Sequence, residues 1–398
     1  MFGNLRALHR TVWLLGIVSL FTDLSTSIVA GLLPGFLTTQ LGVTVATVAL
    51  IDAVAESTAS FGKLFSGVLS DWVGRRKELA LLGYGLSGLG KFLFPIAGNA
   101  GMVLGARFAD RLGKGIRGAP RDALVADVTP SAVRGLAFGL RQALDEAGSL
   151  LGPLVAMALM WLLLNDVQAV FWVACIPAVL SLAVLGFGVR EEAAPRAPDA
   201  GKFPLRMEAL RGLGGRFWWF IAVLLILLLP RFTEAFFLLR GQELGLSQGF
   251  APALLAAVAL MTTFLTAPVG SLSDRIGRWP LLFAGFAALA ASHIVLALAG
   301  AIWAAFLGAA LVGLHLALTQ GVLATLVADM APRNLRGTAF GIFHLVSGIA
   351  LLGTLVGGEI WDAWGSPAMF WIAAAVTGLG LVALLPFARR RGTEAIAE

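Results

Sequence analysis

The sequence predicts an all-α membrane protein with twelve transmembrane helices arranged as two pseudo-symmetric six-helix bundles. Hydrophobic residues make up 58% of the 398 residues and charged residues only 13%, which is about half the charged fraction of a soluble domain. Apolar runs long enough to cross a bilayer recur along the chain. Two motifs of the first half also return in the second half at nearly the same offset.

The apolar runs give the membrane topology. A bilayer core takes about 20 apolar residues per helix. Segments of this kind lie near residues 11–37, 44–70, 78–98, 101–127, 133–163, 167–189, 216–239, 249–272, 279–299, 302–329, 335–357 and 366–387. Alternate gaps hold basic residues, as in Arg75, Arg76 and Lys77, whereas gaps such as TTQLG and GNAG hold none. Because Lys and Arg collect on the cytoplasmic side, we expect a multi-pass protein of the cell (inner) membrane with both termini in the cytoplasm.

The two halves of the chain repeat each other. GVLSDWVGRR (67–76) aligns with GSLSDRIGRW (270–279) at an offset of 203, and LVADVTPSAVRGLAFG (124–139) aligns with LVADMAPRNLRGTAFG (326–341) at 202. Such a repeat indicates duplicated six-helix halves, as in transporters that bind substrate near the midplane between them. We therefore expect a bundle over 1–190, a cytoplasmic linker over 191–215 that is rich in Pro, Ala and charge, and a bundle over 216–398 with a short cytoplasmic tail.

Two glycine-containing motifs carry a family resemblance. The first motif consists of Gly67, Asp71, Gly74, Arg75 and Arg76, with a second copy at Gly270, Asp274, Gly277 and Arg278. It resembles the cytoplasmic gate motif of the major facilitator superfamily (MFS), and the resemblance extends over nearly the whole chain. The second motif, Gly139, Gly148, Gly152 and Pro153, resembles the antiporter motif of drug and proton-exchange members, although Ala156 and Met157 replace its last two glycines. Stretches such as DRLGKGIRGAPRDALVAD further resemble a prokaryotic permease group of unassigned substrate. The resemblance implies the MFS fold and secondary transport by alternating access.

Charged residues inside the predicted spans mark the candidate site. In the fourth span, Arg107, Arg111, Lys114, Arg117 and Arg121 share about one third of the helix circumference, so this stripe cannot face lipid. At about 1.5 Å per residue, Arg111 lies near the midplane. The predicted proton-coupling residues are Asp23, Glu56, Arg111 and Asp145, because a carboxylate beside an arginine can exchange a proton as access alternates. We expect Asp23 or Glu56 to carry the proton, with Arg111 as its partner.

Other polar residues in the spans are candidates for the substrate cavity. These are Arg107, Lys114, Glu146, Arg231, Glu234, Gln320 and His344. Fixed ion pairs that hold helices together are the competing interpretation, above all for Asp52, Lys63, Arg117, Asp122 and Arg141. We interpret His293 and His315 as core residues rather than ligands.

Several functional classes are not expected. A single cysteine and four scattered histidines give no disulfide and no metal site, and no cofactor is expected. Outside the charged stripe of the fourth span, the basic residues stand mainly in short gaps between apolar runs, which argues against nucleic acid as a partner. No nucleophile–base set or nucleotide-binding domain is visible, so we expect neither an enzyme nor an ATP-driven pump.

The expected function is proton-coupled antiport that exports a small organic compound or drug. We expect a monomer whose partners are the substrate, protons and the lipid bilayer. The alternatives are transport of an anion or metal chelate, a lipid flippase, and a non-transporting membrane scaffold or sensor.

Overall fold

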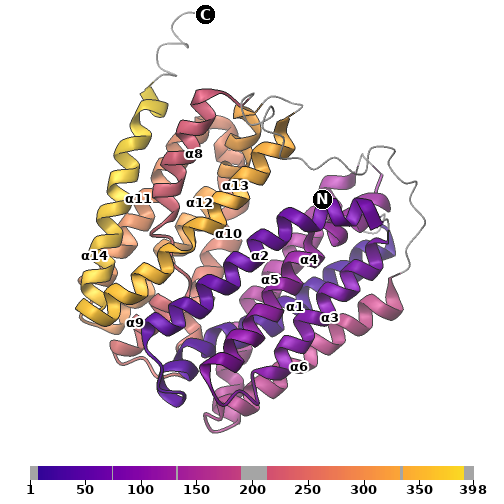
Figure 1. Cartoon of the computed structure of the whole chain (residues 1–398), viewed down its shortest axis with the longest axis horizontal. Helices are drawn as coiled ribbons and strands as arrows, with labels where there is room; N and C mark the ends of the chain where they lie inside the picture. Colours follow the sequence, from indigo (N-terminus) through magenta and orange to yellow (C-terminus); the bar gives the residue numbers. More distant parts are fainter. Residues whose placement is uncertain (1–7, 74, 131–132, 190–212, 332–334, 390–398) are drawn as a thin grey trace, which may run out of the picture. The chain divides into compact units, whose positions relative to one another are not determined.

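The computed structural model describes residues 8–73, 75–130, 133–189, 213–331 and 335–389, which are almost entirely helical and contain no β-strand (Figure 1). The elements of the N-terminal half are α1 (Arg10–Gly35), η2 (Phe36–Gln40), α2 (Val45–Val73), α3 (Arg76–Leu93), α4 (Ala100–Asp127), α5 (Arg134–Leu162), α6 (Val167–Ala183) and η4 (Val184–Gly188). Those of the C-terminal half are α8 (Gly214–Leu228), α9 (Ala235–Glu243), α10 (Pro252–Ile276), α11 (Arg278–Ala297), α12 (Ile302–Met330), α13 (Arg336–Ala350) and α14 (Gly353–Arg389).

The predicted all-helical membrane fold is confirmed, with helical segments at all twelve predicted spans. Two spans are not single helices. The span at 216–239 breaks between α8 and α9, where Pro230 cannot donate a backbone hydrogen bond. The span at 335–357 breaks at Leu351 and Leu352, and its second part continues into α14. Gly365 then turns α14 into the last span with a φ of 82°, a conformation that glycine adopts without steric cost. Seven of the described helical segments are long and apolar enough to cross a membrane by themselves.

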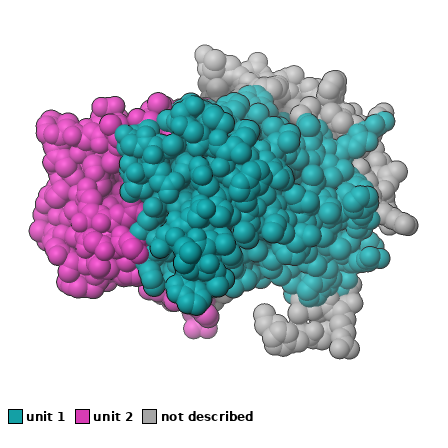
Figure 2. Space-filling view, turned by 90° about the horizontal axis from the view of Figure 1, so that it is seen from below, with its two compact units in different colours: residues 1–43, 54–203, 248–256 teal, residues 44–53, 204–247, 257–398 magenta. Residues whose placement is uncertain are grey.

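Contacts between helices divide the chain into two compact units, coloured separately in Figure 2. Unit 1 contains residues 1–43, 54–203 and 248–256, and unit 2 contains residues 44–53, 204–247 and 257–398. The start of α2 therefore belongs to unit 2. There the Asp362 carboxylate accepts hydrogen bonds from the backbone N–H groups of Val45 at 3.1 Å and Ala46 at 2.8 Å, so it caps the N-terminus of α2. The expected linker at 191–215 lies outside the described residues except for its last three.

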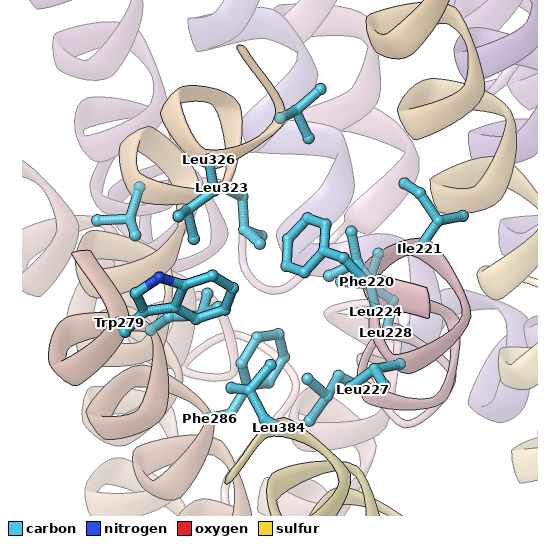
Figure 3. Close-up of a cluster of buried hydrophobic side chains, with 14 of the residues drawn as sticks. Phe220, Ile221, Leu224, Leu227, Leu228, Trp279, Phe286, Leu323, Leu326 and Leu384 are labelled. Carbon is cyan, nitrogen blue, oxygen red and sulfur yellow. The ribbon is translucent and has the colours of Figure 1, made fainter. Parts of the chain in front are cut away.

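Each unit has its own apolar core. In unit 1, α1 supplies Val12, Leu15 and Val18, which pack with Ala80 and Tyr84 of α3. In unit 2, side chains of α8, α11, α12 and α14 meet around Phe220, Trp279, Phe286, Leu323 and Leu384 (Figure 3). The rings of Phe220 and Trp279 make an edge contact at 5.8 Å between centroids. These cores hold each bundle together and fix how far each helix is rotated about its axis.

Candidate functional site

The antiporter motif brings α1 and α5 into backbone contact within unit 1. A Cβ added at Gly148 would strike the carbonyl oxygen of Leu20 and lie 3.0 Å from the backbone nitrogen of Leu24. Small residues of this kind allow membrane helices to approach closely. Because the two backbones touch here, neighbouring polar side chains on the two helices also meet. Asp23 of α1 and Asp145 of α5 lie within hydrogen-bonding range of each other.

The other residues of this motif differ in their surroundings. A Cβ at Gly152 would lie 3.0 Å from the carbonyl oxygen of Leu24, so this glycine also serves the contact between α1 and α5. Pro153 lies inside α5, where it removes one backbone donor. Gly139 is exposed, and a Cβ there would meet no described heavy atom within 4 Å. The structure therefore gives a close-packing role to two of the three glycines.

Two arginines face Asp145. The Nη1 atoms of Arg121 on α4 and Arg141 on α5 lie 3.7 Å and 3.8 Å from Asp145 Oδ1. Both guanidinium groups also contact Asp122 Oδ1, with Arg121 Nε at 3.1 Å and Arg141 Nε at 3.7 Å. Arg121 additionally donates to the Ser19 hydroxyl of α1 at 3.2 Å. We call Asp23, Asp122, Asp145, Arg121 and Arg141 the carboxyl cluster.

The carboxyl cluster places the Asp23 and Asp145 side chains close enough to interact. Two carboxyl groups form a hydrogen bond only when one of them is protonated, because a carboxylate has no donor. Lys114 and Arg117 also lie within electrostatic range of Asp23. The Arg117 guanidinium is additionally placed over the Tyr84 ring, 4.7 Å from its centroid. The cluster therefore brings two carboxyl groups of different helices together among several cations.

A second group of charges lies between α2, α3 and α4. Arg111 Nε pairs with Glu56 Oε1 at 2.7 Å, and Arg111 Nη1 lies 3.9 Å from Asp110 Oδ2. Lys91 Nζ pairs with Asp110 Oδ1 at 3.1 Å, and both of these side chains are only 2% exposed. Ser87 donates to the same Asp110 oxygen. We call Glu56, Lys91, Asp110 and Arg111 the four-charge cluster, whose two cations and two anions leave it without net charge.

The structure arranges the predicted proton-coupling residues as two separate pairs. Arg111 is placed beside Glu56, as expected, but Asp23 lies beside Asp145. Arg111 therefore pairs with Glu56, which is one of the two carboxylates expected to be its partner. The depth of residues along each helix could be read from the sequence. Their partners depend on how far each helix is rotated, and the α1–α5 contact at Gly148 sets that rotation.

The predicted cavity residues of unit 1 lie around these clusters. Arg107 and Lys114 are within electrostatic range of Glu56. Glu146 is half-buried on α5 and accepts a hydrogen bond from the Gln142 amide at 2.9 Å. Arg121 and Arg141 were not among the expected site residues. The four-residue spacing of Arg141 and Asp145 was the available signal, because such pairs share one helix face.

The predicted cavity residues of unit 2 are distributed over three places. Arg231 and Glu234 lie at the break between α8 and α9, within electrostatic range of each other. Gln320 is exposed on α12. The His344 ring on α13 lies 5.4 Å from the ring of Phe343. Among the described residues, no group of three or more His, Cys, Asp or Glu could hold a metal ion.

The gate motif is described in part. Arg75 pairs with Glu78 at 3.2 Å. Arg76 contacts Asp127 at the end of α4, and Arg278 contacts Asp329 on α12. The two aspartates occupy equivalent positions in the sequence repeat, whereas Arg278 is equivalent to Arg75 rather than to Arg76. Gly277 precedes α11 with a φ of 86°. Of the other predicted gate residues, Gly74 lies outside the described residues, and Gly67, Asp71, Gly270 and Asp274 lie outside the side chains that the structure describes.

Comparisons with known proteins agree with this architecture. The family model of the Major Facilitator Superfamily matches residues 15–351 and, in a second match, 235–398. An uncharacterized MFS-type transporter of Methanocaldococcus jannaschii is 29% identical over 384 residues, which cover 94% of each chain. The class C tetracycline resistance protein of Escherichia coli is 34% identical over 130 residues, which cover 32% of each chain.

The fold also matches solved structures. The crystal structure of the nucleoside transporter NupG superposes with a TM-score of 0.79, at 12% identity, over 96% of this chain and 100% of that chain. At this identity the match concerns the fold alone. With the family model matching nearly the whole sequence, the chain belongs to the major facilitator superfamily of membrane transporters.

Proposed function

We propose that this protein is a proton-coupled antiporter that exports a small organic compound. The carrying observation is the carboxyl pair of Asp23 and Asp145, which lie within hydrogen-bonding range on two different helices. The relatives support transport as the activity, and the tetracycline resistance protein among them supports an organic compound as cargo.

The proton is proposed to control the α1–α5 contact. When the pair holds one proton, the two carboxyl groups attract each other through a hydrogen bond. When the proton leaves, the two carboxylates repel each other; two like charges at about 4 Å repel by on the order of 4 kcal/mol at an effective dielectric constant of about 20. The guanidinium groups of Arg121 and Arg141 offset part of this repulsion. Protonation thereby biases the two arrangements of helices that alternating access requires.

The cations are proposed to prevent permanent protonation. Burial favours the neutral form of a carboxyl group, and nearby positive charge favours the ionised form. Asp145 lies between two arginines, whereas Asp23 has Lys114 and Arg117 within electrostatic range. A modest movement of one cation can therefore release the proton, which is the behaviour that an exchanger needs.

The four-charge cluster is proposed to serve mainly as structure. Asp110 and Lys91 satisfy each other at 3.1 Å, and both are buried. Glu56 has Arg111 at 2.7 Å, so its charge is matched by one close partner. Glu56 is therefore the second candidate for the coupling proton, after Asp23.

The test measures flux in proteoliposomes that carry a pH gradient, with tetracycline as the first cargo. We expect Asp23→Asn and Asp145→Asn each to abolish gradient-driven flux, because one amide and one carboxyl group can no longer share and release a proton as the carboxyl pair does. The matched control is Asp166→Asn, since Asp166 caps α6 through a 3.0 Å hydrogen bond from Ala169 N–H and asparagine caps equally well. Unchanged proton-driven flux in both cluster variants would exclude this site.

A second test needs no cargo. Difference infrared spectroscopy of the purified protein detects the C=O stretch of a protonated carboxyl group. We expect Asp23→Asn to remove one such band and Asp166→Asn to leave it in place. If the band persists in Asp23→Asn and in Asp145→Asn, the proton does not reside on this pair.

The remaining expectations become parts of the same proposal. We propose a monomer in the inner membrane with bundles over 1–190 and 216–398, a linker over 191–215 and both termini in the cytoplasm. The basic residues Arg75, Arg76 and Lys77 support this orientation through the positive-inside rule. Reporter domains fused to either end, whose activity depends on the compartment, check the orientation. A periplasmic signal from either terminus would contradict it.

A further inference from the structure

Unit 2 contains buried polar atoms that the proposed proton site does not use. The His293 and His315 side chains are 4% and 1% exposed, and Thr354 is fully buried. His293 Nδ1, His315 Nε2, Thr354 Oγ1 and Thr233 Oγ1 have no hydrogen-bond partner among the described residues. Buried polar atoms are normally paired, and a site of function is a common reason for an exception. Both histidines are buried, as expected of core residues, but one ring nitrogen of each has no hydrogen-bond partner among the described residues.

These atoms gather around two helix breaks that touch each other. The first break lies between α8 and α9, and the second lies between α13 and α14. A Cβ at Gly353, the first residue of α14, would strike the carbonyl oxygen of Leu229, the C-cap of α8. A Cβ at Gly357 would lie 3.0 Å from the Phe232 ring, and this ring lies 5.9 Å from that of His293. Discontinuous helices of this kind form substrate sites in several transporter folds.

The chemistry of the site favours an anion with a neighbouring donor. His315 Nδ1 lies 2.9 Å from the Gly285 carbonyl oxygen, so Nδ1 carries the hydrogen and, in the neutral ring, Nε2 is an acceptor. Arg231 lies within electrostatic range of His315 and provides the positive charge at the break. Glu234 lies within range of Arg231, and an incoming anion would compete with it.

Aromatic rings lie beside both histidines. The Phe286 ring lies 4.9 Å from that of His315, and the Phe370 ring lies 6.2 Å from that of His293. Together with Phe232, these rings favour a flat apolar group on the ligand. We propose that unit 2 binds an aromatic or cyclic organic acid that carries a hydroxyl or amine beside its carboxylate. Arg231 contacts the carboxylate and His315 Nε2 accepts the hydrogen bond from the neighbouring donor. This inference rests on the proposed transport function and names the class of its cargo.

Three matched probes test the proposal on the full-length protein in detergent. Mandelate carries a ring, a carboxylate and a hydroxyl, phenylacetate lacks the hydroxyl, and 1-phenyl-1,2-ethanediol lacks the carboxylate. Ligand-dependent thermal stabilisation gives a Kd for each. We expect mandelate to bind most tightly, with phenylacetate roughly threefold to tenfold weaker, as the loss of one neutral hydrogen bond implies.

Variants assign the two contacts. Arg231→Gln should weaken both acids by roughly tenfold to a hundredfold and leave the diol unchanged, because a charged hydrogen bond is lost. His315→Leu should remove the difference between mandelate and phenylacetate. Glu234→Gln should tighten both acids, since it removes the competing carboxylate. Arg216→Gln is the control, because Arg216 is exposed on the same span and its charge change is identical. Arg231→Lys retains the charge and serves as the second variant if Arg231→Gln does not fold.

Three results would contradict the proposed organic-acid site in unit 2. Equal binding of all three probes, absence of binding at millimolar concentration, or equal loss in Arg216→Gln and Arg231→Gln would overturn the assignment. These measurements need no proton gradient. Failure of the proton-coupling proposal with intact mandelate binding therefore leaves this site standing, and loss of binding with intact coupling refutes this site alone.

Discussion

The close contact between α1 and α5 can be tested with one methyl group. A Cβ at Gly148 would strike the Leu20 carbonyl oxygen and lie 3.0 Å from the Leu24 nitrogen, whereas ordinary contacts lie at about 3.5–4.0 Å. Both obstacles are backbone atoms, which cannot rotate away. Gly148→Ala therefore forces α1 and α5 apart, at an overpacking cost of about 3 kcal/mol.

The higher helix propensity of alanine offsets part of this overpacking cost, and a second glycine on the same helix provides the control. Alanine stabilises a helix interior by about 1 kcal/mol relative to glycine. Gly148→Ala should therefore lower the free energy of unfolding by about 2 kcal/mol in total. Gly139→Ala on the same helix meets no described heavy atom within 4 Å, so it should raise that free energy by about 1 kcal/mol. The two variants are expected to differ by about 3 kcal/mol.

The assay is reversible unfolding of the purified protein in mixed micelles, followed by tryptophan fluorescence. The sign of the change at Gly148 is the decisive result. If Gly148→Ala is as stable as the unchanged protein, or more stable than Gly139→Ala, the backbones of α1 and α5 do not touch. The pairing of Asp23 with Asp145 would then lose its structural cause.

Three further predictions use the same unfolding assay. Lys91→Met and Asp110→Leu should each cost about 3–5 kcal/mol, because each leaves a buried charge without its closest partner. The double variant should be close to the unchanged protein, and additive losses would contradict a buried pair. Asp362→Ala should cost about 0.5–2 kcal/mol, because it removes the cap of α2. Asp362→Asn should cost clearly less, because asparagine can still cap the helix, and equal losses in the two variants would argue against capping. Arg240→Met should cost at least about 3 kcal/mol, because Arg240 donates to the carbonyl oxygens of Leu296 in the last turn of α11 and of Ala299 just after it, at 3.1 Å and 2.9 Å. Glu243→Gln keeps those two bonds, and a loss as large as that of Arg240→Met would contradict the assignment.

Membrane topology was predictable because its causes are local. Apolar length decides whether a segment can span a bilayer, and each predicted span holds a helical segment. The break within the seventh span, between α8 and α9, was harder to predict from the sequence. Pro230 and the polar residues after it were the signal, but a single proline within an apolar run does not by itself end a membrane helix. The break at Leu351 and Leu352 has no proline and no glycine within it, so tertiary contacts decide it.

The candidate site was predictable in composition but not in pairing. Asp23, Glu56, Arg111 and Asp145 could be selected because charges inside membrane spans are costly and have functional roles. Helical spacing also placed Arg141 and Asp145 on one face. Which side chains meet across helices depends on rotations that no single helix specifies, and Asp23 consequently pairs with Asp145 rather than with Arg111. The two histidines are core residues, as expected, but nothing in the sequence indicated whether each ring nitrogen has a hydrogen-bond partner.

The sequence by itself determined that the chain spans the membrane in two repeated halves and carries charges within its spans. Hydrophobicity, motif spacing and helical period are properties of neighbouring residues, so they can be read from the chain. Only the tertiary structure decided that Gly148 lets α1 and α5 touch, and that two carboxyl groups meet beside this contact. It also decided that the α8–α9 break and the α13–α14 break touch at Leu229 and Gly353. Histidine nitrogens without a hydrogen-bond partner among the described residues lie nearby. These facts depend on packing between residues that are distant in sequence, because close approach of two backbones is a property of both helices at once.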